Sequence, residues 1–313
     1  MGKKNVVWNS YISKNERFAD LVNGVVFLGK QVVLPGALTA LDSKLWRRVQ
    51  EKGSYGEFTR DMVKIWEYRG KKYLFGLEPE ESPHFALPVK YMNYESLEYD
   101  RQYRGILQEH RKGRDLSPDR YISGFSETDR LMPVVTIGIY LGEKPWKGSA
   151  GIGEMAGMGE IPPEIRGQMS AFWNDFHVNL LDIHGLETPD VFRTDLREVF
   201  GFLQRQGNKE ELVRYVEGNG AFRHLEEDAF DVLGCYGGNA KLELCKEDYR
   251  TKGGMDMCTA LRELEEDARA EGRNLMNELN RRLIRDGRTE DLFRSIEDAE
   301  YQRQLLVEYG MEG

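Results

Sequence analysis

An almost uninterrupted apolar run at residues 131–141 is the strongest single constraint on the fold of this 313-residue chain. It is rich in Val and Ile and is interrupted only by Pro133, Thr136 and Gly138. The run is far shorter than the roughly 20 apolar residues that a membrane helix needs. We therefore expect a strand that is buried on both faces of a sheet, and we expect no membrane partner.

Two further strand-like runs, 61–68 and 72–78, flank a short turn at Arg69-Gly70. Glycine permits the positive φ that a tight turn needs. With a two-residue or four-residue loop at this point, residues pair when their numbers sum to 139, which sets Asp61 opposite Glu78. Their Cβ atoms would then lie roughly 5 Å apart, and like charges in such a pair destabilise a sheet. A chain tolerates them most readily when a cation lies between them or one carboxylate is protonated.

Glu80 follows Glu78 by two residues, so both side chains share one face if the strand continues through Pro79. Three carboxylates would then converge at one end of a hairpin. Such oxygen ligands suit Mg²⁺ or Mn²⁺, which can activate a water and stabilise charge on a phosphodiester. The alternative is an acidic cluster at a strand end that water simply solvates.

Helical patterns surround these strands. Residues 14–27 carry an amphipathic stripe, with Ser13 expected as the N-cap and Glu16 completing a capping box. A long helix is expected from Pro88 to about residue 112, an irregular glycine-rich segment at 148–167 and a strand at 176–183. Further helices are expected at 191–206, 209–216, 224–233, 255–270, 275–286 and 290–309. The fold class that follows is α/β, more closely α+β.

The net charge of −9 lies entirely in the last third of the chain. Residues 1–207 hold 28 basic and 28 acidic side chains, whereas residues 208–313 hold 16 basic and 25 acidic ones. A DNA partner would therefore have to be held by a local basic surface on the first part. The three cysteines form no CxxC pair and the N-terminus carries no apolar signal segment, so we expect free thiols and a cytoplasmic protein.

Several motifs, taken in order, resemble one known group of proteins. The sequence is similar to the recombination-promoting nuclease (Rpn) and transposase-like group of the PD-(D/E)XK nuclease superfamily. The matching segments are Asn15-x-x-Phe18-Ala19-Asp20, Arg60-Asp61-Met62-Val63-Lys64, Leu77-Glu78-Pro79-Glu80, Leu87-Pro88-Val89-Lys90-Tyr91-Met92-x-Tyr94, and residues 122–125 and 133–142 with Trp146.

The resemblance implies a restriction-endonuclease-like α-β-β-β-α-β core in residues 1–217, followed by a helical region at 218–313. It also implies Mg²⁺- or Mn²⁺-dependent cleavage of DNA, with Asp61 and Glu78 as the first two metal ligands. The third motif position usually carries Gln in this group and Lys in the wider superfamily, but here it is Glu80. A carboxylate cannot donate a hydrogen bond unless it is protonated. Either Glu80 is a third metal ligand, or catalysis is weakened or lost.

Other side chains could support this site. Lys90 could reach back from the long helix as a substitute for the missing lysine, although a solvated helix lysine is the simpler interpretation. Tyr94 lies one turn further and is equally well explained as a packing residue. Asn15, near the border of the first helix's buried stripe, and Asp20, on its polar face, are candidate auxiliary groups.

Three functional hypotheses follow from these residues. The chain is a Mg²⁺-dependent DNA endonuclease, a degenerate nuclease fold that binds DNA or protein without cutting, or a helical scaffold in which the acidic hairpin has no role. Basic residues near the end of the long helix could contact phosphates or form a salt-bridged solvated face. The C-terminal helices could form a packed subdomain or the interface of a homo-oligomer.

Overall fold

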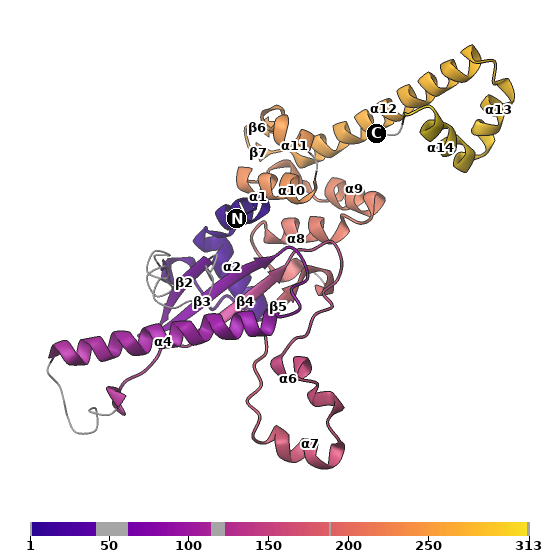
Figure 1. The fold of residues 1–313 in the computed structure, drawn as a ribbon. Coiled ribbons are helices and arrows are strands. Elements are labelled where there is room, and N and C mark those ends of the chain that lie inside the picture. Colours follow the sequence, from indigo (N-terminus) through magenta and orange to yellow (C-terminus); the bar gives the residue numbers. More distant parts are fainter. Residues whose placement is uncertain (1, 42–61, 114–122, 188, 239, 312–313) are drawn as a thin grey trace.

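A five-stranded mixed sheet forms the centre of the protein (Figure 1). The structure, a computed structural model, describes residues 2–41, 62–113, 123–187, 189–238 and 240–311. The strands follow one another across the sheet in chain order: β1 (Leu38–Ala40), β2 (Met62–Tyr68), β3 (Lys71–Glu80), β4 (Val134–Tyr140) and β5 (Asn179–Asp182). The first three pair antiparallel, and β3–β4 and β4–β5 pair parallel. The expected mixture of helices with a sheet is confirmed.

The hairpin between β2 and β3 has the register that the sequence predicts. Tyr68 pairs with Lys71 and Met62 with Leu77, so paired numbers sum to 139. Arg69 and Gly70 have φ values of 50° and 73°, as a two-residue turn between twisted strands requires. β3 continues through Pro79, which pairs with Ile139, and ends two residues later than expected.

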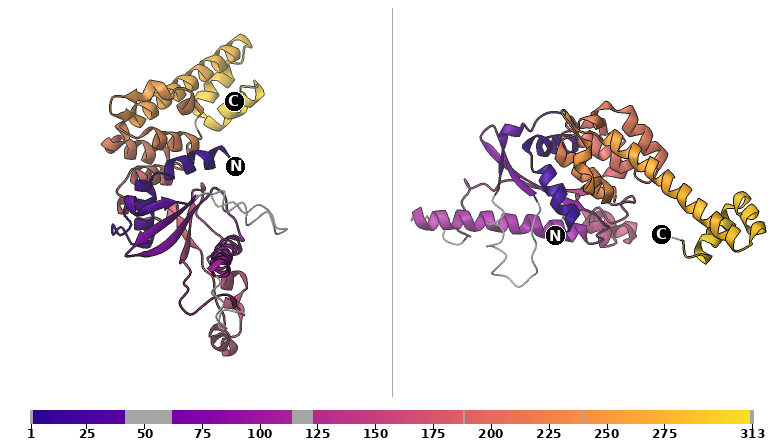
Figure 2. Two further views of the ribbon diagram at one scale, coloured as in Figure 1. Left: turned by 90° about the vertical axis from the view of Figure 1, so that its left-hand side faces the viewer. Right: turned by 90° about the horizontal axis from the view of Figure 1, so that it is seen from above.

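Helix α4 (Leu87–Gly113) crosses over from β3 to β4 and covers one face of the sheet. The opposite face is covered by four helices (Figures 1 and 2): α1 (Lys3–Ile12), α2 (Asn15–Val26), α8 (Leu196–Arg205) and α10 (Glu227–Tyr236). Strand β4 is accordingly buried on both sides, as predicted. Ile137 and Ile139 belong to the large apolar cluster under the four helices, whereas Val134 packs with Leu74 and Tyr99 on the α4 side.

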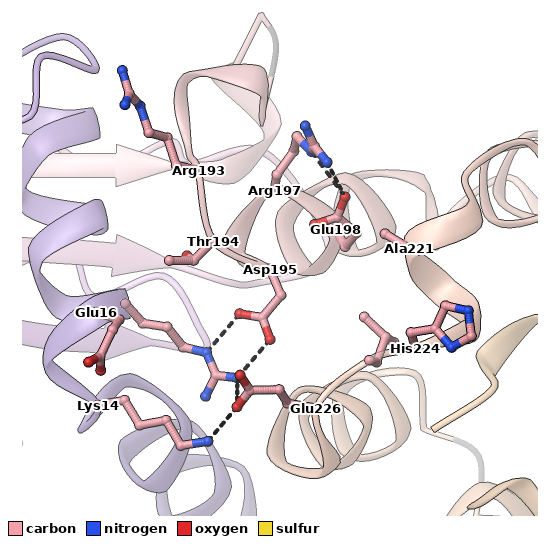
Figure 3. A pocket seen from close by; sticks show the side chains of 12 residues that line it. Lys14, Glu16, Arg193, Thr194, Asp195, Arg197, Glu198, Ala221, His224 and Glu226 are labelled. Atoms are coloured by element: carbon pink, nitrogen blue, oxygen red, sulfur yellow. Dashed lines mark hydrogen bonds and ion pairs between the residues drawn. The ribbon is translucent and has the colours of Figure 1, made fainter. Parts of the chain in front are cut away.

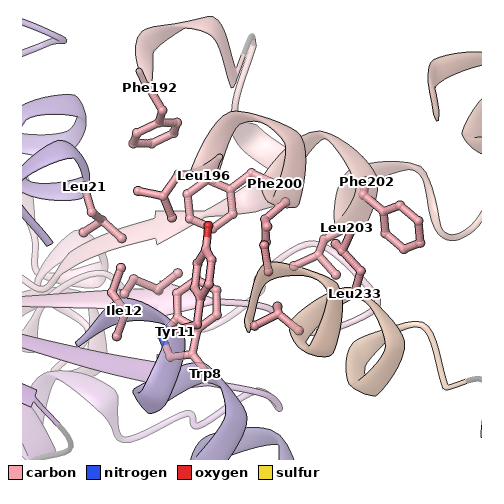
Figure 4. Packing of buried hydrophobic residues seen from close by; sticks show 14 of the residues in the cluster. Trp8, Tyr11, Ile12, Leu21, Phe192, Leu196, Phe200, Phe202, Leu203 and Leu233 are labelled. Carbon is pink, nitrogen blue, oxygen red and sulfur yellow. The ribbon is translucent and has the colours of Figure 1, made fainter. Parts of the chain in front are cut away.

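The large apolar cluster is centred on aromatic side chains from both ends of the chain (Figure 4). Trp8 stacks on Phe200 with ring centroids 6.0 Å apart, and Phe192 meets the other side of Phe200 at 5.1 Å. The cluster extends from Trp8 to Ala260, so residues on both sides of position 217 contribute to it. The domain boundary after residue 217 stays a prediction.

The start of the chain differs from expectation. Residues 3–12 form helix α1, which the sequence pattern did not predict, and Trp8, Tyr11 and Ile12 are fully buried. The Ser13 backbone N–H bonds to Asn9 O and its hydroxyl donates to Ser10 O, so Ser13 ends α1. The expected N-cap role of Ser13 is therefore wrong, and Lys14 precedes α2 without any side-chain cap.

The C-terminal region contains one long helix where two were expected. Helix α12 (Met257–Arg285) continues through Gly272, and the expected helix at 290–309 is divided at Asp298. Asp298 Oδ1 accepts hydrogen bonds from the backbone N–H groups of Glu300 and Tyr301, which starts a new helix there. The remaining elements of this region are α9 (Lys209–Gly218), α11 (Ala240–Leu244), β6 (Arg250–Thr251), β7 (Gly254–Met255), α13 (Thr289–Glu297) and α14 (Ala299–Glu308).

Two parts project from the body of the molecule (Figures 1 and 2). One is the distal part of α12 with α13 and α14, where Leu279, Leu283 and Leu305 form a small separate cluster. The other is the segment between β4 and β5, expected to be irregular, which holds α6 (Ile152–Met155) and α7 (Pro163–Ser170). Short 3-10 turns complete the fold at Pro35–Ala37, Met158–Glu160, Ile183–Gly185, Pro189–Val191, Gly220–Arg223 and Lys246–Tyr249. None of the helices in the described ranges has the length and apolar composition needed to cross a bilayer.

Candidate active site between strand β3 and helix α4

Two buried carboxylates lie at the end of β3, on the side that faces α4. Side chains alternate along a strand, so Leu77 points into the large apolar cluster and Glu78 and Glu80 point the other way. Glu78 is 2% exposed and Glu80 is 7% exposed. Burial of ionised carboxylates is costly unless they are paired or coordinate a metal.

Glu80 is held by two consecutive residues of α4. Lys90 Nζ donates to Glu80 Oε1 at 2.7 Å, and the Tyr91 hydroxyl donates to the same oxygen at 3.1 Å. Only 21% of the Lys90 side chain is exposed. The simpler interpretation of Lys90 as a solvated helix lysine is therefore wrong, because its ammonium group reaches back to Glu80.

The sequence around the start of α4 explains this approach. Leu87, Tyr91 and Tyr94 follow one another at helical spacing and form a buried cluster with partly buried side chains that include Leu180. This packing presses α4 against the sheet. Gly138 of β4, the neighbour of Glu78 across the sheet, provides the space, because a Cβ there would lie 2.5 Å from the Tyr91 hydroxyl.

Tyr94 packs against Tyr91, and this packing also brings its ring close to the Lys90 ammonium group. Its ring stacks on Tyr91 with centroids 6.2 Å apart. Lys90 Nζ lies 5.8 Å from the centroid of each of the two rings. This distance lies within the range of cation–π attraction. The two rings thus flank the ammonium group on the same helix that carries it.

The environment keeps Tyr91 protonated. Burial raises the pKa of its hydroxyl well above 10, and the charges of Glu80 and Glu78 raise it further. A protonated hydroxyl can donate, so the hydrogen bond to Glu80 persists at any pH near neutrality. Tyr91 was not among the predicted site residues, although the apolar spacing of Leu87, Tyr91 and Tyr94 in the sequence could have revealed it.

Two predicted auxiliary residues lie on the other side of the sheet. Asn15 donates to Pro35 O and accepts from the Lys64 ammonium, which faces α2 beside the Phe18 ring. Burial lowers the pKa of this lysine. The structure therefore does not bring Asn15 to Glu78 and Glu80.

The expectation that Asp20 lies on a polar helix face is wrong, because it is only 3% exposed. Its Oδ2 accepts from the backbone N–H groups of Arg193 and Thr194 and from the Thr194 hydroxyl. A segment 173 residues later in the chain therefore covers this carboxylate. Asp20 fixes the approach to α8 and does not contribute to the site under α4.

A second ionic cluster lies on the α2 side, next to a cavity of about 560 Å³ (Figure 3). Arg17 donates twice to Asp195 and twice to Asp228, and all three of its nitrogens are used. Its side chain is 3% exposed, and the Tyr11 ring lies 4.0 Å from the guanidinium carbon. Burial lowers the pKa of Arg17, but the hydrogen bonds that it donates to Asp195 and Asp228 outweigh burial and keep the group charged. This cluster joins α2 to the segment before α8 and to α10.

The donor set under α4 fits a hard divalent cation. Glu78 and Glu80 offer carboxylate oxygens, and Mg²⁺ usually keeps several waters and needs only a few protein ligands. Within the ranges that the structure describes, no group of three or more His, Cys, Asp or Glu side chains is placed to hold a metal. Asp61, the first expected ligand, and its expected pairing with Glu78 lie outside the described residues.

Comparison with known proteins assigns no family. The chain matches no family model, no curated protein and no solved structure. The similarity to the Rpn group therefore remains a prediction from the order of its motifs.

Proposed function

We propose that the protein is a metal-dependent DNA endonuclease that hydrolyses phosphodiester bonds, of the recombination-promoting, transposase-like kind. The observation that carries this proposal is the convergence of Glu78, Glu80 and Lys90 between β3 and α4. Both carboxylates are withdrawn from bulk water, and carboxylate oxygens are the ligands that a hard divalent cation prefers.

The order of elements supports a restriction-endonuclease-like core as part of the proposal. Helix α2 is followed by three strands that pair antiparallel, then by α4, and then by β4 parallel to β3. This is the α-β-β-β-α-β succession that the resemblance implies. The two carboxylates lie on the third strand of that succession.

Glu78 and Glu80, together with Asp61, would hold the Mg²⁺ or Mn²⁺ ion. The bound ion would supply an activated water and stabilise charge on the phosphate. Glu78, with 2% exposure, is the most buried acidic ligand of this set among the described residues. A carboxylate withdrawn from water interacts more strongly with a cation than an exposed one.

Lys90 supplies the positive charge that the third motif position lacks. Glu80 occupies the position where Gln or Lys would be expected, and the ammonium group of Lys90 reaches that same carboxylate from α4 at 2.7 Å. It therefore lowers the local negative potential that an approaching phosphate would meet. The protonated hydroxyl of Tyr91 fixes the orientation of Glu80 at the same time.

One observation favours a second candidate function, a degenerate nuclease fold that binds DNA or protein without cutting. Glu80 Oε1 already accepts hydrogen bonds from two donors. If this ion pair persists with DNA bound, Glu80 is not a metal ligand. The protein would then keep the nuclease fold without its reaction.

Plasmid cleavage separates the two candidates. We expect purified protein to nick or linearise supercoiled plasmid with Mg²⁺ or Mn²⁺ and not with EDTA. Glu78→Gln and Asp61→Ala should remove cleavage, whereas Glu81→Gln, a matched change at an exposed neighbour, should retain it. Plasmid retarded in a gel but not cut would support the degenerate fold. Cleavage unaffected by Glu78→Gln would refute the proposed site.

We also propose a cytoplasmic location, since all three cysteines are free thiols. Assembly through the C-terminal helices stays a prediction. Light scattering of the purified chain measures its mass and tests it.

A further inference from the structure

Two adjoining cavities lie at the end of the sheet where the β2–β3 hairpin turns. One, of about 570 Å³, is lined by Lys71, Lys72, Tyr73 and Arg130 together with Gly70 and residues 131–133. The other, of about 520 Å³, is lined by Tyr99, Asp100, Tyr103, Ser123, Phe125 and Leu131. Leu131 lines both, so the two cavities are neighbours, and together they are here named the hairpin groove. Each cavity has the size of a typical small-ligand pocket, about 300–1,000 Å³.

The first half of the hairpin groove is basic. Lys71 and Lys72 are exposed, and neither ammonium group has an ion pair within the described ranges. The Arg130 guanidinium is fixed beside them through hydrogen bonds from Nη1 to the backbone oxygens of Glu127 and Asp129. Arg69 adds a further exposed cation at the turn. These groups are available for an anionic ligand.

The second half of the hairpin groove is aromatic. The rings of Tyr103 and Phe125 lie 6.1 Å apart and are tilted by 41°, and both are half-buried. The Tyr103 hydroxyl donates to Ser123 O, which fixes its ring. Among the described residues, Asp100 is the single acidic residue that lines either cavity, and it is paired with Arg104. Planar apolar surface therefore continues directly from the cluster of cations.

We propose that the hairpin groove binds a single-stranded segment of nucleic acid. Cations that follow a phosphate backbone next to aromatic rings that stack on bases are the combination by which proteins hold unpaired strands. Lys71, Lys72 and Arg130 contact the phosphates, and bases stack on Tyr103 and Phe125. Paired bases expose no free face for this stacking, so duplex DNA binds more weakly.

The groove is a separate site from the buried carboxylates. Glu80 lies nine positions after Lys71 in β3, which corresponds to about 30 Å along a strand. Binding in the groove therefore requires neither a metal nor an intact acidic site. The proposal rests on the proposed function only in the choice of DNA as the ligand, and it adds that the substrate contains an unpaired stretch.

Fluorescence anisotropy with a labelled oligothymidylate in EDTA tests the groove without cleavage. We expect the double change Lys71→Glu with Lys72→Glu to weaken binding at least tenfold. The slope of log K against log salt should fall by about 1.4, since each lost phosphate contact on a single strand contributes about 0.7. Tyr103→Ala should weaken binding roughly 5- to 150-fold and Tyr103→Phe hardly at all, because only the ring stacks.

The matched control is Lys252→Glu, a lysine in the turn of the β6–β7 hairpin, which should bind as wild type. Equal affinity of the double lysine variant and wild type, no binding by wild type, or tighter binding of duplex than of single strand would each overturn the proposal. Glu78→Gln should bind normally in this assay. If wild type cleaves plasmid but does not bind the oligothymidylate, the groove alone is refuted. If wild type binds the oligothymidylate in the groove but does not cleave plasmid, the nuclease alone is refuted.

Discussion

Two ionic clusters lie on opposite sides of the sheet, and they differ in how far their carboxylates are exposed. On the α2 side, Arg17 and Lys14 meet Asp195, Asp228 and Glu226, and the Glu226 side chain is 63% exposed. On the α4 side, Lys90 meets Glu80 next to Glu78, and both carboxylates are at least nine-tenths buried. Water therefore solvates Glu226 in the first cluster. The protein encloses both carboxylates of the second cluster.

This difference separates a structural network from a candidate reaction centre. The Arg17 cluster is complete, since every guanidinium nitrogen is bonded and the cluster joins three distant segments. The Glu80 cluster instead places two buried carboxylates side by side on one strand. Buried carboxylates with shifted or shared protons are common at functional sites.

The largest effect is expected from Arg17→Met. The substitution leaves Asp195 and Asp228 without their main partner, and breaking a buried ion pair from one side typically costs about 3–5 kcal/mol. Urea unfolding measures this loss in the free energy of unfolding. Arg303→Met is the matched control, because its ion pair with Glu300 is 70% exposed on the arginine side and 69% on the glutamate side and should contribute less than about 1 kcal/mol. Equal losses for both variants would remove the distinction between a structural and a peripheral pair.

Lys90→Met should have the next largest effect. It leaves the buried Glu80 carboxylate with Tyr91 as its recorded donor, and an unsatisfied buried group costs about 1–3 kcal/mol. If the site takes a cation, millimolar Mg²⁺ should raise the melting temperature of this variant more than that of wild type. Lys112→Met, an exposed change near the end of the same helix, should show neither effect. A variant as stable as wild type would mean that the Lys90–Glu80 pair is not needed for the fold.

A pH titration should reveal the α2-side cluster through Asp228. Burial raises the pKa of this carboxyl, but hydrogen bonds from Arg17 and Lys14 outweigh burial and hold the pKa below its usual value. A depressed folded pKa contributes stability that is full above the unfolded value, near 3.9, and is lost as the pH falls through the folded value. Unfolding curves below pH 5 should therefore be less pH-dependent for Asp228→Asn than for wild type. Parallel curves would show that the pair does not form in solution.

Tyr91→Phe should have the smallest effect. It removes one hydrogen bond to Glu80 and leaves Lys90 in place, so the expected loss is about 0.5–1.5 kcal/mol. Tyr73→Phe is the control, because the Tyr73 hydroxyl makes no hydrogen bond with the rest of the described chain. The combination with Lys90→Met should cost more than the two single changes added together, since Glu80 then loses both donors. Additive losses would indicate that the two donors act independently.

Local rules were sufficient for the hairpin and its carboxylates. The turn at Arg69-Gly70 determines the pairing of neighbouring strands, and a two-residue alternation then places Glu78 and Glu80 on one face. Helical spacing likewise predicted α4, although it favoured a solvated Lys90. These features depend on residues within about 20 positions of one another along the chain.

Contacts between distant segments were beyond the reach of the sequence. The burial of Asp20 depends on residues 193 and 194, and that of Arg17 on Asp195 and Asp228. The position of Asn15 depends on Lys64, a partner on a strand rather than on a helix. Asp20 was therefore assigned to the polar face of its helix, although contacts with a distant segment enclose it.

The predicted helix boundaries in the last third of the chain were wrong for a related reason. Gly272 weakens a helix by about 1 kcal/mol relative to alanine, but the turns on either side outweigh one unfavourable residue. Asp298 has the opposite effect, because its carboxylate caps a new helix in the middle of a continuous helical pattern. The intrinsic helix propensities of Gly272 and Asp298 alone do not show which of the two residues interrupts a helix.

Each end of helix α12 packs in a different apolar cluster, and its middle belongs to neither cluster. Neither cluster includes a residue from 265–278, a stretch of about 20 Å of helix. Heat or denaturant can therefore melt the small cluster around Leu283 while the large one stays intact, and amide protons of α13 and α14 should exchange well before those of α8. The distal end of the molecule should therefore unfold independently of the sheet that carries the carboxylates.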